Sequence, residues 1–165
     1  MSINKISEQD VESYKEEYYK KCLTPYKELR PSSSSLERSI YDYIKEDYSV
    51  PDKVIAYLRA GQPAYMCPGI YKHPLKNGIT LLGPYVYTDG YYTWDRDTWK
   101  YVIKYGLTLP EAFIDHVMSE KGTAFIEQRM AENYNWSDVI NSWTEKSDFL
   151  CLLPKNTGDK ELEDF

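Results

Sequence analysis

The middle of the chain is interrupted again and again by residues that break helices. Between Gly61 and Gly90 there are four prolines and five glycines, and a helix interior tolerates neither well. Short apolar runs lie between them, and Asn77-Gly78 and Asp89-Gly90 are strong signals for tight hairpin turns. This segment predicts a small antiparallel meander of about three to five strands. Its apolar runs cover residues 64–67, 79–82, 85–87 and 91–94.

Helical patterns flank the meander on both sides. Ser7 is a suitable N-cap with Asp10 at the capping-box spacing, and residues on one helix face recur from Val11 to Cys22. Asp95 can cap a helix that Gly106 closes, and Pro110 suits the first turn of the next. Further helices are predicted at residues 36–47, 51–61, 124–132 and 137–143, and a last short strand at 149–153.

This order of elements predicts a single α+β domain. The chain has 165 residues, which suits one domain with its own core. We expect residues 1–154 to form it, with a small mid-chain sheet packed against helices from both ends, and residues 155–165 to form a polar, frayed tail.

Charge and cysteine content indicate which partners and which cellular compartment to expect. The net charge is −6, which argues against nucleic acid as a partner because phosphates require clustered Lys and Arg. Three widely spaced cysteines without a CxxC pair predict reduced, buried thiols and a cytoplasmic protein. No apolar stretch approaches the roughly 20 residues of a membrane span, so we expect no membrane contact.

No pattern typical of catalysis is present in the sequence. The chain contains no GxGxxG, P-loop, GxSxG or HExxH motif, so we expect no enzyme activity, catalytic residue, cofactor or metal ligand. His73 and His116 are interpreted as surface or boundary residues. Asp89 is explained by its turn and Asp95 by its helix cap.

The aromatic hairpin leaves two interpretations open. Tyr85 and Tyr87 share one face of a strand, and Tyr92 and Trp94 share one face of the next. Such residues can form the inner face of a two-layer fold, which we favour, or a flat platform that stacks on a sugar. We expect Trp94 and Trp99 to be largely buried.

A longer motif carries a resemblance. The stretch "YTDGYYTWDRDTWKYVIKYGLTLPEAFIDHV" is similar to a TDG-x-x-x-W…Y-V…Y…L-P-x-x-F signature of small bacterial immunity proteins. These belong to polymorphic toxin and contact-dependent growth inhibition systems. The matching positions are Thr88, Asp89, Gly90, Trp94, Tyr101, Val102, Tyr105, Leu109, Pro110 and Phe113. Asp95 replaces the proline that usually follows the tryptophan. The matched motif residues, together with Trp99, are expected to be structural.

The resemblance implies a non-catalytic inhibitor that binds a cognate toxin domain. Such a partner can be basic and nuclease-like, and residues 101–165 carry twelve acidic and six basic side chains. We expect the contact to use Glu120, Glu127, Glu132, Asp138 and Tyr134, because opposite charges steer association. The alternative is a carbohydrate-binding or carbohydrate-processing protein that uses the Tyr/Trp platform.

Overall fold

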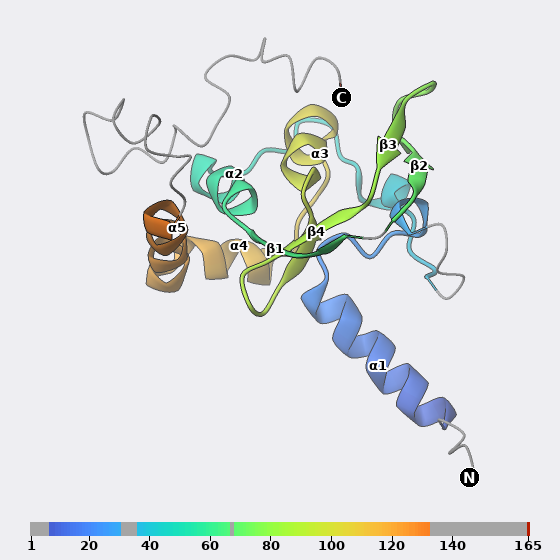
Figure 1. Ribbon diagram of the computed structural model, residues 1–165, viewed down its shortest axis with the longest axis horizontal. Helices are drawn as coiled ribbons and strands as arrows, with labels where there is room; N and C mark the ends of the chain where they lie inside the picture. The colour runs from blue at the N-terminus through green and yellow to red at the C-terminus, as the bar shows by residue number, and fades with distance from the viewer. Residues whose placement is uncertain (1–6, 31–35, 67, 133–164) are drawn as a thin grey trace.

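The computed structural model describes residues 7–30, 36–66, 68–132 and 165. These residues form five α-helices and five short strands, so the predicted α+β class is confirmed (Figure 1). The elements are α1 (Glu8–Lys21), α2 (Asp52–Arg59), β1 (Gln62–Met66), β2 (Ile70–Lys72), β3 (Thr80–Leu82), β4 (Tyr85–Thr88), β5 (Thr93–Asp95), α3 (Thr98–Tyr105), α4 (Glu111–Met118) and α5 (Glu120–Glu132).

The strand pairs among the described residues are antiparallel, as the hairpin signals predict. β1, β4 and β5 form a three-stranded sheet with β4 in the centre, and β2 and β3 form a separate hairpin. The Asp89-Gly90 turn connects two expected strands, and the Asn77-Gly78 turn precedes the expected strand β3. β2 was not predicted, because its three residues carry too short a pattern to stand out between glycines.

One face of the three-stranded sheet packs on the main helical layer. Trp94 of β5 is fully buried there, and its indole Nε1 donates a hydrogen bond to the Leu58 carbonyl of α2 at 2.9 Å. The Phe113 ring of α4 lies 6.1 Å from the Trp94 ring, centre to centre. Trp99 is also buried. The predicted burial of both tryptophans is confirmed.

The segment that follows α1 covers part of the other sheet face. Tyr65, Val86 and Asp95 lie in one row across β1, β4 and β5, so their side chains share a face. Asp95 is buried and forms an ion pair with Arg30. The prediction of Asp95 as a helix cap is therefore wrong: β5 extends through it, and Asp97 stands at the N-cap of α3.

The predicted helix at residues 36–47 is also wrong. Only a single 3-10 turn forms there, at Ile40–Tyr43. The backbone pairs with distant segments instead: Lys45 N–H donates to Gly106 O at 3.0 Å, and Thr108 N–H donates to Tyr43 O at 2.8 Å. These bonds replace the i→i−4 ladder that the apolar spacing suggests.

The remaining helices agree with their signals. Ser7 and Asp10 form the predicted capping box, and Gly106 ends α3 in the left-handed conformation. α5 begins at Glu120, earlier than the predicted start at residue 124. The helix predicted at 137–143 and the strand at 149–153 lie outside the described residues. The last residue of the predicted polar tail, Phe165, is buried and contacts the Tyr101 ring.

Candidate functional site

The β4–β5 turn is tied to two helices through Asp89. Its Oδ1 accepts hydrogen bonds from the backbone N–H groups of Tyr91 and Tyr92 at 2.8 and 2.7 Å. Its Oδ2 accepts one from the Tyr57 hydroxyl of α2, and His116 Nε2 of α4 lies 3.5 Å away. Asp89 thus connects the turn to α2 and α4.

Asp89 and His116 lie beside the Tyr57 hydroxyl, and Asp89 affects its protonation. Burial, followed by the hydrogen bond to Asp89, raises the pKa of Tyr57 above its ordinary value. The hydroxyl therefore stays protonated and donates to the carboxylate. Its oxygen also lies 3.1 Å from His116 Nε2. His116 is partly exposed, in agreement with its interpretation as a boundary residue, and its contact is with Asp89 rather than with its neighbour Asp115.

The other motif residues belong to the scaffold. Thr88 Oγ1 donates to Tyr92 O at 2.7 Å and accepts from Gly90 N–H at 2.9 Å, which closes the turn. Trp94, Tyr101 and Phe113 are fully buried. Thr88 therefore closes the turn, and Trp94, Tyr101 and Phe113 belong to the core.

The aromatic hairpin is core on one face. Tyr92 is 9% exposed and packs edge-on against Phe113, while Trp94 is completely buried. These two rings are not accessible to stack on a sugar. Tyr91, in contrast, is 54% exposed at the turn.

Tyr91 belongs to a surface groove between α1 and the sheet, which we name the tyrosine groove. It has a volume of about 500 Å³ and is lined by Tyr14, Glu17, Tyr18, Lys21, Cys22, Tyr65, Tyr91 and Thr93. α1 projects away from the rest of the domain (Figure 1). None of the residues of α1, all of which are described, is buried. Sequence reasoning missed this groove because its walls come from segments far apart in the chain.

A cation already lies inside the tyrosine groove. Lys21 Nζ is 2.8 Å from Glu17 Oε1 and lies 5.3 Å from the centre of the Tyr91 ring. The hydrogen bond to Lys21 lowers the pKa of Glu17, and the same bond raises the pKa of Lys21. Cys22 at the base of the groove is a buried free thiol, as predicted. The groove therefore combines aromatic rings with one carboxylate, Glu17, that is paired with a lysine of the same helix.

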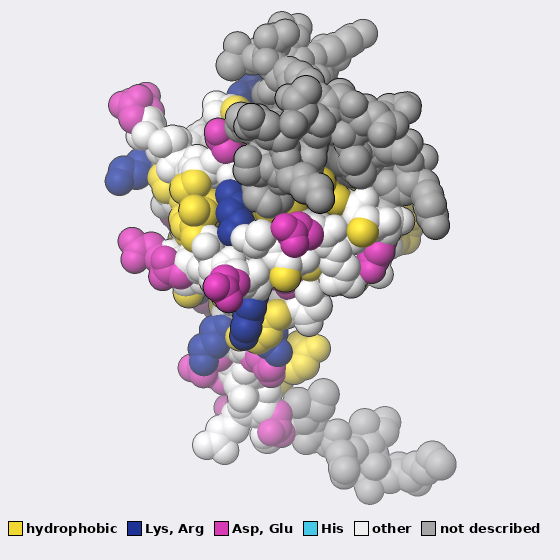
Figure 2. Space-filling model, turned by 90° about the vertical axis from the view of Figure 1, so that its left-hand side faces the viewer, with side chains coloured by type: hydrophobic (Ala, Val, Ile, Leu, Met, Phe, Trp, Pro, Cys, Tyr) yellow, Lys and Arg dark blue, Asp and Glu magenta, His cyan; other side chains and the backbone are white. Residues whose placement is uncertain are grey.

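The acidic residues predicted to contact a partner are partly dispersed. Glu120, Glu127 and Glu132 are exposed on α5. Glu120 and Glu127 are about two turns apart and share a face, whereas Glu132 points elsewhere and pairs with Arg129 at 3.2 Å. Figure 2 shows acidic and basic side chains interspersed on this side of the molecule. Tyr134 and Asp138 lie outside the described residues.

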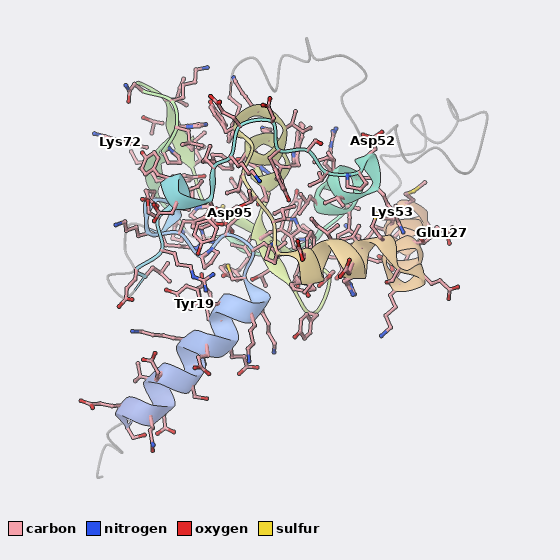
Figure 3. All side chains as sticks on the ribbon, turned by 180° about the vertical axis from the view of Figure 1, so that it is seen from behind. Tyr19, Asp52, Lys53, Lys72, Asp95 and Glu127 are labelled. Atoms are coloured by element: carbon pink, nitrogen blue, oxygen red, sulfur yellow. The ribbon has the colours of Figure 1, made fainter. Side chains whose placement is uncertain are left out.

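The two surfaces are well separated. Figure 3 shows Glu127 at one edge of the molecule and Tyr19 on α1, far from it. α1, which forms one wall of the tyrosine groove, and the exposed face of α5 are therefore separate surfaces.

His73 lies in the core, so its interpretation as a surface or boundary residue is wrong. Its Nδ1 accepts a hydrogen bond from Leu75 N–H at 3.1 Å. Its buried Nε2 has no partner among the described residues. Burial, with Lys76 and Lys104 adding to it, lowers the pKa of His73 to about 4. The ring packs on Tyr101 and Phe165, which the loop sequence around Pro74 did not indicate.

The described ranges contain neither a group of metal ligands nor a membrane-spanning helix. There, no group of three His, Cys, Asp or Glu side chains is placed to hold a metal ion. Over the same residues, no helix has the length and apolar character to cross a bilayer. Comparisons with protein-family models, with curated proteins and with solved structures found no match.

Proposed function

We propose that this protein binds a bacterial toxin domain and neutralises it by direct contact, without chemistry of its own. The tyrosine groove is the observation that carries the proposal. Tyr14, Tyr65 and Tyr91 are each more than half exposed around a hollow. Tyrosine is enriched among the residues that dominate binding energy, because it buries a large ring with little loss of conformational freedom.

Different residues form the core and the groove, and this separation supports the proposal. Five of the ten residues that resemble the immunity-protein signature are buried, namely Trp94, Tyr101, Val102, Leu109 and Phe113, and the groove draws Tyr14 and Tyr65 from outside that motif. A scaffold of this kind can present a binding surface that differs from one protein to another. We infer that the protein acts in the cytoplasm of the cell that makes it, where its toxin would otherwise act.

The acidic side chains are assigned a different part in binding. We propose that Glu120, Glu127, Glu132 and Asp138 help to steer a basic, nuclease-like toxin domain toward the protein, and that Tyr134 adds an uncharged contact. Long-range attraction raises the association rate without fixing the final contacts. The groove then supplies the close contacts that slow dissociation.

Co-expression with the toxin-like protein encoded beside this gene tests the proposal. The wild-type protein should restore growth of cells that produce the toxin domain, and the two should co-purify. An unfolded variant serves as the control for expression load. Absence of both protection and co-purification would contradict the proposal. Saturable glycan binding by calorimetry would then support the carbohydrate-binding alternative.

A further inference from the structure

We propose that the tyrosine groove receives an arginine or lysine side chain from a partner protein and that Glu17 and the groove tyrosines recognise its positive charge. The partner's identity as a toxin rests on the proposed function, whereas this recognition chemistry can be tested without it.

Lys21 shows that the groove accommodates a cation. Its ammonium group forms an ion pair with Glu17, which lies on the same helix, and faces the Tyr91 ring of the β4–β5 turn. The Lys21 and Glu17 side chains are 41% and 64% exposed, and an exposed pair of this kind contributes little to stability. A partner cation can therefore displace Lys21 into solvent and take its place.

An arginine would fit this arrangement better than Lys21 does. A planar guanidinium can bind a carboxylate with two hydrogen bonds and stack on an aromatic ring at the same time. The fold uses such stacking elsewhere: Arg96 lies 4.4 Å from the centre of the Tyr85 ring, and Arg38 lies 4.1 Å from that of Tyr19. Within the groove, Tyr14 is 77% exposed and offers a further ring surface.

A protein segment is the occupant that the surroundings favour. β1, which contributes Tyr65 to the groove, is an edge strand: in the described part of the chain it pairs with β4 alone. Its neighbour Met66 is half-exposed, so an extended segment that carries the cation could lie along this edge. The net charge of −6 disfavours a nucleic acid and favours a basic segment.

The experiment is an NMR titration of the full-length, ¹⁵N-labelled protein with a hexa-arginine peptide. Saturable shifts are expected at the amides of Tyr14, Glu17 and Tyr91, and a hexa-glutamate peptide should cause none. Glu17→Gln and Tyr91→Ala should each weaken binding about fivefold to tenfold, which corresponds to the loss of one partly desolvated cation contact. Glu12→Gln is the matched control, because it removes the same charge from the opposite side of α1.

Lys21→Ala gives the sharpest result, because it removes the internal competitor. Affinity for the peptide should rise by more than it does in Lys15→Ala, which deletes the same charge away from the groove. Equal effects of these two changes, or equal effects of Glu12→Gln and Glu17→Gln, would show nonspecific attraction and overturn the inference. A dimer that Tyr14→Ala dissociates, detected by light scattering, would overturn it in favour of a second copy.

The two proposals fail in distinguishable ways. If the peptide binds in the groove and no neighbouring toxin is bound, the proposed function fails and the recognition chemistry stands. If the toxin is bound equally well by the wild type, Glu17→Gln and Tyr91→Ala, the function stands and the groove inference fails.

Discussion

Arg30, in the segment after α1, forms an ion pair with Asp95 of β5 through two hydrogen bonds. Arg30 Nη2 lies 2.5 Å from Asp95 Oδ1, and Nη1 lies 3.1 Å from Oδ2. Thr24 Oγ1 donates a further hydrogen bond to Oδ1 at 3.2 Å. Burial raises the pKa of the Asp95 carboxyl, and Arg30 opposes that effect. The pair fixes the segment after α1 on β5 and thereby sets the position of α1.

Asp95→Asn should destabilise the fold by about 3 kcal/mol or more, because it leaves the Arg30 charge buried without its counter-ion. Urea unfolding provides the measurement. Glu17→Gln breaks the exposed pair with Lys21 and should leave the unfolding midpoint almost unchanged. Similar midpoints for both variants would contradict the buried pair.

Tyr57→Phe and Tyr101→Phe should differ, although both tyrosines are fully buried. Removing the Tyr57 hydroxyl takes a donor from Asp89 and should cost about 1–3 kcal/mol. The Tyr101 hydroxyl interacts with the Tyr71 side chain but has no partner at good hydrogen-bond geometry in the described parts of the chain, so its removal should cost less than removal of the Tyr57 hydroxyl. Thermal unfolding of the two variants side by side tests this contrast.

Acidification should weaken the fold through His73. Its pKa in the folded protein is about 4, below its ordinary value of 6.5, so the unfolded chain binds the proton more tightly. Stability is therefore complete above about pH 6.5 and falls as the pH drops toward 4. The denaturation midpoint of His73→Leu should fall less steeply over this range. Parallel slopes for variant and wild type would remove His73 as the cause.

Two glycines should resist substitution for different reasons. Gly90 has a φ of +100° with no described atom within 4 Å of an added Cβ, so Gly90→Val should cost about 1 kcal/mol or more through backbone strain. A Cβ on Gly122 would lie 1.9 Å from Val117 O. Gly122→Ala should therefore cost about 2 kcal/mol or more, although alanine favours helices. Unchanged melting temperatures would contradict both arguments.

Charge reversal on α5 should affect association more than stability. Glu120→Lys combined with Glu127→Lys should slow binding of a basic toxin domain and flatten its salt dependence. The melting temperature should hardly change because both side chains are exposed. Asp42→Lys with Glu46→Lys changes the charge equally elsewhere. Stopped-flow rates that are the same for both pairs would remove α5 from the steering surface.

Local signals predicted most of the fold. The capping box at Ser7, the turns at Asn77-Gly78 and Asp89-Gly90, and the end of α3 at Gly106 all depend on neighbouring residues, and all are confirmed. The helix prediction for residues 36–47 was wrong because their backbone hydrogen bonds go to partners far along the chain. The prediction of Asp95 as a helix cap was wrong for the same reason, because Asp95 instead forms an ion pair with Arg30, which is distant in the sequence.

The candidate site was harder to predict than the fold. The tyrosine groove brings Tyr14 of α1 together with Tyr65 of β1 and Tyr91 of the β4–β5 turn. No spacing rule connects such distant positions. The residues singled out in the sequence, such as Asp89 and Trp94, were conspicuous because they build the scaffold.

No residue of α1 is buried, so substitutions in this helix have little effect on the stability of the fold. Substitutions at Val11, Tyr14 or Glu17 change the surface that another protein meets, and they leave the interior packing as it is. Mutations in this helix can therefore accumulate one at a time without disturbing the core. Variation of α1 changes the exposed surface while the scaffold stays the same.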